Sequence, residues 1–317
     1  MKEPLLFAKL IASQALRLAT SEIYETWSAE EVTHQTRAEA EQLVCEVMGW
    51  SRLSLLQHLT QEVPADSEAL VEQAVERRLN GEPLAYILGH THFYGRVFET
   101  RPGCLIPRPD TETLVEATLS FVRSAACRRA SDHPLRLVEI GPGTGCIAVT
   151  LALECPQTSV TAVDIAKEAV ELTRENALHL GASVEVIRAD GLQWLRAQAD
   201  VGQSFDVIVS NPPYIPKGEL LQLDRDVRDF EPHIALDGGV DGLDFYRAFA
   251  DLPTSVLGSQ ARCAGFFFEV GSGQAQHVAE LFRAQPGWSG FTVRTRRDLR
   301  GIERVVEVIR EGRTAHS

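Results

Sequence analysis

The stretch LVEIGPGTG at residues 137–145 indicates the fold of this chain more directly than any other segment. An apolar run, 137–140, leads directly into three glycines within five residues, and a helix is expected to begin near Cys146. Glycine lets the backbone turn sharply and approach a ligand closely, and a helix N-terminus favours a carboxylate or a phosphate. The spacing is GxGxG, one residue tighter than the dinucleotide-binding pattern GxGxxG. We therefore predict a strand, a ligand-binding loop and a helix in that order.

The same alternation of strand and helix patterns extends from residue 111 to the C-terminal part of the chain. Alternation of this kind implies right-handed βαβ units and a Rossmann-like, doubly wound α/β sheet. A nearly continuous apolar strand such as 205–209 suits a sheet buried on both faces. In such folds ligands bind at the carboxyl ends of the strands. The expected strands are 135–140, 160–163, 184–187, 205–209, 265–270, 291–295 and 305–309.

The N-terminal part of the chain has a different texture, and 317 residues favour two domains. Residues up to 89 have helical patterns, with one helix opening at a capping box, TRAE at 36–39, and another over 66–80. The alternating, aromatic segment 92–100 predicts a β-hairpin. We expect a helical bundle at 1–89, a β-hairpin linker at 90–109 and an α/β domain at 110–317.

Composition narrows the function classes. The chain is 44% hydrophobic and 24% charged, with a formal net charge of −13. No apolar run is long enough for a signal peptide or a membrane span, so we expect a cytoplasmic protein. The acidic balance disfavours a nucleic-acid substrate, although a local basic patch is compatible with it, and it favours a protein partner. The six cysteines are scattered without a CxxC pair, so we expect reduced thiols and no metal site.

Acidic residues end the next two expected strands. Asp164 follows the second strand, where a carboxylate can accept hydrogen bonds from both hydroxyls of a ribose. Asp190, followed by Gly191, ends the third strand and could reach an adenine ring. A single Asp at a strand end is often only a helix cap, but three successive strand ends favour a nucleoside cofactor. The arrangement resembles the cofactor site of class I S-adenosylmethionine methyltransferases, with NAD as the alternative. The candidate cofactor residues in these three segments are Gly141, Pro142, Gly143, Thr144, Gly145, Asp164, Asp190 and Gly191.

The fourth expected strand ends in the tetrapeptide Asn211-Pro212-Pro213-Tyr214. Its two prolines lack N–H donors and hold the preceding residues extended, so the carbonyls of Asn211 and Pro212 can point into a site. Together with the Asn211 side-chain oxygen they suit a planar NH2 group, on whose face Tyr214 can stack. Hydrogen bonds to an amide NH2 move electron density onto its nitrogen and strengthen as that nitrogen is methylated. We predict that these four residues are catalytic and bind the substrate amide, with an ordinary Asn-Pro turn as the alternative.

Several further segments resemble the HemK/PrmC family, the protein-(glutamine-N5) methyltransferases of peptide chain release factors. They are GEPLAYILG at 81–89, IPRPDTE at 106–112, ALDGGVDGLDFY at 235–246 and DLRGIER at 298–304. The resemblance implies a seven-stranded class I methyltransferase fold with S-adenosylmethionine as methyl donor and S-adenosylhomocysteine as product. It also implies that residues 141–145, Asp164 and Asn211 contact the cofactor. The implied substrate is the glutamine of the Gly-Gly-Gln loop in class-1 release factors.

Some features leave alternatives open. Family members often have threonine at the position of Pro142, and proline should only stiffen the loop. They often have an aromatic residue at the position of Gly191, so the group that stacks on adenine is undetermined here. Trp194 is either that group or a core residue. Arg108 is a candidate catalytic residue or a brace for the linker through Asp110 or Glu112. A nucleic-acid exocyclic-amine methyltransferase would share the NPPY tetrapeptide, and a non-catalytic binding module would keep only the fold. The acidic charge and the linker motifs favour the protein substrate, docked by residues 1–89 of a monomeric enzyme.

Overall fold

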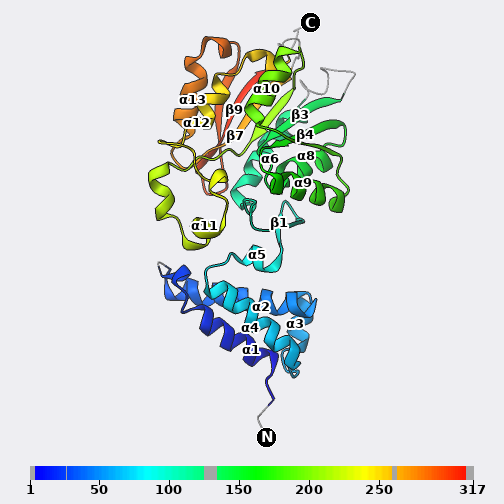
Figure 1. Ribbon diagram of the computed structural model, residues 1–317, viewed down its shortest axis with the longest axis vertical. Coiled ribbons are helices and arrows are strands. Elements are labelled where there is room, and N and C mark those ends of the chain that lie inside the picture. Colours follow the sequence, from blue (N-terminus) through cyan, green and yellow to red (C-terminus); the bar gives the residue numbers. More distant parts are fainter. Residues whose placement is uncertain (1–3, 26, 125–133, 259–262, 312–317) are drawn as a thin grey trace. The chain divides into compact units, whose positions relative to one another are not determined.

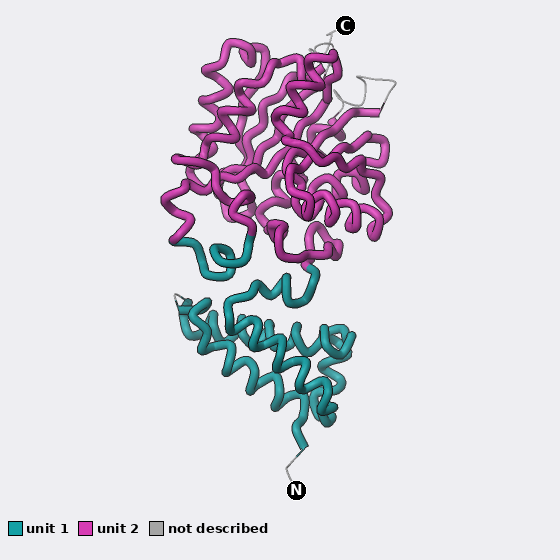
Figure 2. The backbone as a smooth tube through the Cα atoms, viewed as in Figure 1, with its two compact units in different colours: residues 1–90, 222–231 teal, residues 91–221, 232–317 magenta. Residues whose placement is uncertain are grey.

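The computed structural model describes residues 4–25, 27–124, 134–258 and 263–311 (Figure 1). The chain forms two compact units, coloured separately in Figure 2. One unit contains residues 1–90 together with 222–231, and the other contains residues 91–221 and 232–317. The segment 222–231 therefore belongs to the N-terminal helical unit although it lies far along the chain. No helix in the described ranges is both long enough and apolar enough to cross a membrane.

Six α-helices lie in the described part of the helical unit. Its core contains Leu10, Leu43, Val44, Val71 and Val75, each at most 1% exposed, at helical spacing along the three longest helices. The helices are α1 (Phe7–Leu18), α2 (Ala29–Met48), α3 (Arg52–His58), α4 (Ala65–Leu79), α5 (Leu84–Leu88) and α11 (Arg225–Phe230).

The expected start of the second helix was wrong. Helix α2 begins at Ala29, and its capping box is formed by Ser28 and Glu31 rather than by the TRAE segment. The Thr36 hydroxyl instead donates to the carbonyl of Val32 inside the helix, at 2.8 Å. Both segments carry capping-box letters, and only the one that follows the non-helical Ser28 can use them, because a cap needs an extended residue at its first position. The other predicted helix, 66–80, corresponds to α4.

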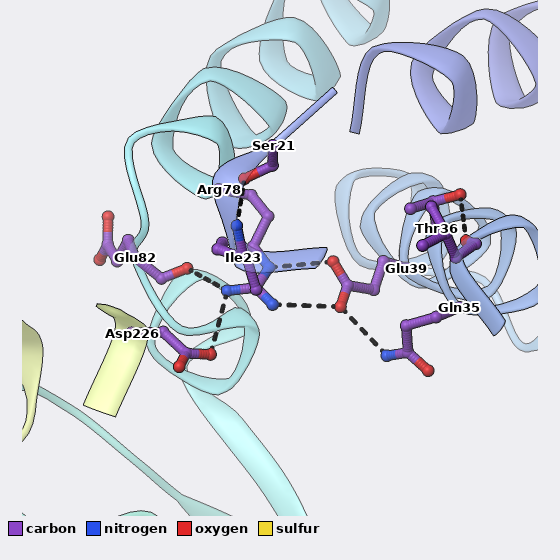
Figure 3. A network of polar contacts seen from close by, with 9 residues as sticks. Ser21, Ile23, Gln35, Thr36, Glu39, Arg78, Glu82 and Asp226 are labelled. Atoms are coloured by element: carbon purple, nitrogen blue, oxygen red, sulfur yellow. Dashed lines mark hydrogen bonds and ion pairs between the residues drawn. The ribbon is translucent and has the colours of Figure 1, made fainter. Parts of the chain in front are cut away.

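A buried arginine holds the segment 222–231 on the helical unit (Figure 3). Arg78 of α4 is 5% exposed and donates to Glu39 of α2 from Nε, at 2.9 Å, and from Nη2, at 3.3 Å. Its Nη1 donates to the carbonyl of Glu82, at 3.1 Å, and to Asp226, at 3.4 Å. The guanidinium also lies over the ring of Tyr24, 5.8 Å from its centroid. A single buried cation thus joins two helices to a segment 148 positions away.

A short hairpin lies at the start of the α/β unit. Strands β1 (His90–Phe93) and β2 (Arg96–Glu99) form a two-stranded sheet. Tyr94 and Gly95 connect them with φ angles of 50° and 71°, and positive φ at both central residues is the geometry of a type I′ turn. The Tyr94 N–H donates to the Glu112 carboxylate at 2.8 Å, which attaches the turn to the first helix of the unit.

The α/β unit contains one seven-stranded sheet in the order β5-β4-β3-β6-β7-β9-β8 (Figure 1). The first five strands in this order are parallel, and β9 runs antiparallel to both of its neighbours. The predicted fold class is confirmed. The strands are β3 (Leu135–Ile140), β4 (Thr158–Asp164), β5 (Val184–Arg188), β6 (Val207–Ser210), β7 (Cys263–Glu269), β8 (Thr292–Arg297) and β9 (Glu303–Glu311).

Helices cover both faces of this sheet and produce two apolar clusters. Successive residues of β7 point to opposite faces, so Phe267 lies in one cluster while Phe266 and Phe268 lie in the other. The first face carries α6 (Glu112–Val122), α8 (Cys146–Glu154) and α9 (Lys167–Leu180), and the second carries α10 (Gly191–Asp200), α12 (Asp244–Ala250) and α13 (Ala275–Ala284). From β3 the chain continues to β4 on one side, and from the adjacent β6 it continues to β7 on the other side. Doubly wound sheets bind ligands at such a point.

The expectation of reduced thiols holds for four cysteines. Cys45, Cys104, Cys146 and Cys155 are free. Cys263, the first residue of β7, is disulfide-bonded, so the expectation is wrong there. Disulfide pairing depends on distances in the folded chain, which scattered cysteines do not reveal. Cys127 lies outside the described residues.

Candidate functional site

A pocket of the α/β unit lies at the carboxyl ends of β3, β4, β5 and β6. The glycine loop forms one wall through Gly141, Pro142, Gly143 and Thr144. Gly141 and Gly143 have φ angles of 74° and 57°, and a β-carbon at either position would meet no atom within 4 Å. Backbone conformation rather than crowding therefore requires glycine, and the loop leaves open space for a ligand.

Gly145 has a different role from the other two loop glycines. It does not belong to the pocket lining, and a β-carbon there would lie 2.8 Å from Cγ2 of Thr173 on α9. The Thr173 hydroxyl donates to the carbonyl of Gly143, at 3.2 Å, and the Asn176 amide donates to that of Thr144, at 2.9 Å. Helix α9 thus approaches the loop closely from behind and holds its shape.

Asp164 ends β4 beside this loop and is 9% exposed. Its Oδ2 accepts from the N–H of Gly143, at 3.2 Å, and its Oδ1 from the N–H of Ala166, at 2.9 Å. Burial raises the pKa of this carboxyl, and the two backbone N–H groups act in the opposite direction. A carboxylate has about four lone-pair positions, so Asp164 can still accept from a pair of ligand hydroxyls.

Glu139 is a second carboxyl of the pocket, which the sequence interpretation missed. It is fully buried, and its Oε2 accepts from the Ala148 N–H at 2.7 Å, while its Oε1 has no hydrogen-bond partner. Burial raises the pKa of Glu139 to about 8. An unpaired buried acceptor is costly unless a ligand supplies a donor. The available signal was a single acidic residue within an apolar strand directly before the glycines.

The third strand end combines a cap with a tight contact. Asp190 caps α10 by accepting from the Gln193 N–H at 3.0 Å, and it also lines the pocket. A β-carbon on Gly191 would lie 2.5 Å from Cγ2 of Ile140, which explains why this position has no side chain. Trp194 packs on Phe205, with ring centroids 5.5 Å apart, and does not line the pocket. The apolar residues at this end of the pocket are Ile165 and Leu192.

The NPPY tetrapeptide follows β6 directly. Asn211, Pro212 and Pro213 line the pocket, whereas Tyr214 is not among its lining residues. The Tyr214 carbonyl accepts from Nε2 of Gln274 at 2.8 Å, and burial raises the pKa of its phenol to about 12. A β-carbon on Gly238 would lie 2.8 Å from Cα of Tyr214. The glycine-rich segment after residue 236 therefore packs tightly against the tetrapeptide.

Comparison with known proteins identifies the family. A family model described as the PrmC N-terminal domain matches residues 14–89, and one described as the methyltransferase small domain matches residues 128–223. The release factor glutamine methyltransferase of Koribacter versatilis is 40% identical over 86% of this chain and 91% of its own length. The chain belongs to the release factor glutamine methyltransferase family. Relatives of the same name from Bordetella pertussis and Bacillus anthracis are 40% and 37% identical over 85% and 90% of this chain, and 93% and 98% of their own lengths.

Two further motifs of this release factor glutamine methyltransferase, IPRPDTE and DLRGIER, meet beside the pocket. Thr111, from the IPRPDTE segment, accepts from Nδ2 of Asn211 at 3.4 Å. Arg108 lines the pocket. Asp110 pairs with Arg304 of the DLRGIER segment at 3.1 Å. Apart from Arg108, a catalytic or bracing candidate, the sequence alone related these segments only through the family resemblance, because residues so far apart give no local sign that they meet.

Proposed function

We propose that this chain transfers a methyl group from S-adenosylmethionine to the side-chain amide nitrogen of the glutamine in the Gly-Gly-Gln motif of class-1 peptide chain release factors. One relationship supports this most directly. Ile140, at the end of β3, pairs with Ser210, at the end of β6, so the glycine loop and the tetrapeptide begin side by side. Membership in the release factor glutamine methyltransferase family supports the choice of substrate.

The pocket fits S-adenosylmethionine in charge and shape, because it offers an open glycine loop, two carboxyls and an apolar end. Asp164 would accept from the ribose hydroxyls, and the orphaned Oε1 of Glu139 suits the cationic amino group of the methionine part. Ile165, which is 51% exposed, and Leu192 would cover the adenine in place of the absent aromatic residue. When bound, the cofactor supplies a methyl group on a positively charged sulfur.

The tetrapeptide would activate the glutamine amide. An amide nitrogen is a poor nucleophile because its lone pair is delocalised into the carbonyl. Acceptors from Asn211 and Pro212 would bind both amide hydrogens, moving electron density onto nitrogen and stabilising the positive charge that develops there. We propose that Pro213, which lines the pocket, and Tyr214 also bind the substrate. Burial raises the pKa of the Tyr214 phenol to about 12, so this side chain stays protonated and uncharged during the step.

We further propose that residues 1–89 dock the release factor, and that the enzyme works in the cytoplasm as a monomer. The helical unit has no part in the pocket lining, so it is free to bind the partner. The net charge of the chain, −13, suits a partner with a basic surface.

The test is methyl transfer to a defined atom. Purified enzyme, a class-1 release factor and isotopically labelled S-adenosylmethionine are incubated, and the labelled residue is located by mass spectrometry. We expect label on the glutamine of Gly-Gly-Gln and none on a release factor with that glutamine replaced by asparagine. Preferential labelling of DNA or RNA offered at equal concentration would replace this proposal with nucleic-acid amine methylation.

A further inference from the structure

A buried glutamate lies behind the tetrapeptide, at the end of the neighbouring strand. Glu269 is the last residue of β7 and is 2% exposed. Phe268 pairs with Ser210, so Glu269 lies at the level of Asn211. Three phenylalanines precede it, and a charged residue at the end of such a run is costly to bury without a role.

Two side chains that line the pocket act on Glu269 as hydrogen-bond donors. The side chains of Thr111 and Asn211 act on its carboxylate as hydrogen-bond donors that lower its pKa, against the larger effect of burial, which raises it. Asn211 Nδ2 also donates to Thr111 Oγ1, at 3.4 Å, and this leaves the threonine hydroxyl hydrogen free to point at the carboxylate. Oε2 of Glu269 has no partner at strict hydrogen-bond distances and angles. The three side chains therefore form a loose chain of donors that ends at the glutamate.

Other charges around Glu269 come from several elements. Arg304 of β9 is the nearest cation, and it is balanced by Asp110, at 3.1 Å, and Asp298, at 3.3 Å. The Tyr246 hydroxyl of α12 donates to the backbone carbonyl of Glu269 at 2.7 Å. The titratable and charged groups that face Glu269 from all packed elements are Arg304, Asp110, Tyr214, Tyr246 and Cys146.

A carboxylate at this place dictates which way the Asn211 amide points. An ionised carboxylate only accepts hydrogen bonds, so the NH2 end of Asn211 must face Thr111 and Glu269. Its Oδ1 accepts no hydrogen bond from the described part of the chain, and Asn211 itself lines the pocket. A flipped amide would place two acceptors, Oδ1 and the carboxylate, against each other and turn a donor toward the substrate NH2.

We propose that Glu269 is a positioning residue, which acts directly and through Thr111 to hold the Asn211 amide with its oxygen toward the substrate. The inference rests on the proposed function, since it assigns the geometry of the acceptor that the glutamine amide requires. Glu269 does not line the pocket, so it touches neither substrate nor cofactor.

Protonation of Glu269 would remove this control. Burial raises the pKa of Glu269 to about 7. A protonated carboxyl can donate as well as accept, so below that pH both orientations of the Asn211 amide are satisfied. The methyl-transfer rate of the wild-type enzyme should therefore fall as pH decreases through about 7.

The decisive variant is Glu269→Gln, which imitates the protonated carboxyl in shape and in its ability to donate. We expect the single-turnover rate at about pH 8 to fall by about ten- to a hundredfold, with little change in cofactor affinity or in KM for release factor. We also expect the variant's rate to be nearly independent of pH across the range where the wild-type rate changes. All rates are measured at saturating S-adenosylmethionine, because Glu139 titrates in the cofactor pocket.

Two controls separate positioning from general damage. Glu307→Gln removes another buried carboxylate of the same sheet, one that accepts from Arg294 and Arg296 away from the pocket, and it should leave the pH profile unchanged. Thr111→Val should reproduce the Glu269→Gln defect, and Thr111→Ser should restore the rate, because serine keeps the hydroxyl.

The outcomes are distinct from failure of the proposed function. If wild-type enzyme does not methylate release factor, the proposed function fails. If wild type is active and Glu269→Gln keeps its rate and its pH profile, the positioning role is overturned. The positioning role is also overturned if Glu269→Gln lowers the rate while the wild-type rate does not depend on pH, because the carboxylate is then only structural. It is likewise overturned if Glu269→Gln loses cofactor affinity together with rate.

Discussion

Arg78 of α4 donates to Asp226, 148 positions later in the chain, at 3.4 Å. The same guanidinium donates twice to Glu39 and is almost fully buried. Removing one partner of a buried ion pair leaves an uncompensated charge, which typically costs about 3–5 kcal/mol. We therefore predict that Arg78→Ala destabilises the helical unit by about that amount in denaturant unfolding. Arg78→Met combined with Glu39→Gln removes both charges and should recover much of the loss; equal instability of the single and double variants would contradict this account.

Asp164 is predicted to carry a large part of the cofactor affinity. Asp164→Ala should weaken S-adenosylmethionine binding by about 1–3 kcal/mol, through loss of hydrogen bonds to a charged acceptor. Because Asp164 also accepts from the N–H groups of Gly143 and Ala166, Asp164→Asn is the matched control, since it keeps one acceptor oxygen. Calorimetry with each folded variant gives the affinity, and an unchanged value for the alanine variant would refute the assigned site.

Asn211 is predicted to act mainly on the rate of methyl transfer. Asn211→Ala should lower the single-turnover rate by roughly two to three orders of magnitude, the effect of removing one group that stabilises transition-state charge. Thermal stability should change little, because the hydrogen bond from this side chain to Thr111 is long, at 3.4 Å. A rate within a fewfold of wild type would exclude the amide-activating role.

Glu139 is predicted to reduce stability at alkaline pH. Its pKa of about 8 lies above the usual 4.5, so the folded state holds this proton more tightly than the unfolded chain does. The stability that this group contributes is fully present below pH 4.5 and is lost as pH rises toward 8. Glu139→Gln should therefore be more stable than wild type above about pH 8, by on the order of 2 kcal/mol, and similar to it near about pH 5.

The same variant should bind S-adenosylmethionine more weakly, because a glutamine cannot ionise to the carboxylate that pairs with a cationic amino group. Thermal unfolding across this pH range, with and without cofactor, measures both effects. A stability difference that does not depend on pH would show that Glu139 is not the titrating group.

Remote contacts are predicted to contribute strongly to catalysis. A short Gly-Gly-Gln peptide should show a kcat/KM lower than that of intact release factor by at least roughly a hundredfold, because binding energy from distant surfaces helps to position the reacting amide. Deleting residues 1–89 would also strip the segment 222–231 of its partners, so the peptide comparison is the cleaner measurement. Equal kcat/KM values would argue against docking by the helical unit.

Local patterns in the sequence were sufficient to predict all seven strands of the large sheet and their order along the chain. Apolar runs bounded by turns predict strands, and alternation with helices predicts parallel pairing. Because parallel strands place their carboxyl ends at one edge, the sequence also predicted that the glycine loop, Asp164, Asp190 and Asn211 converge. The sequence prediction failed where two local patterns were equally good, as with the two possible capping boxes near the start of α2.

The sequence by itself determined the fold class and the main wall of the pocket, because both follow from residues close together in the chain. Only the tertiary structure decided which side chains stand behind that wall. Glu269 meets Asn211 and Thr111, and Arg78 meets Asp226, across separations that leave no periodic trace. The burial that raises the pKa of Glu139 and Glu269 likewise exists only after strands and helices have excluded water from both faces of the sheet.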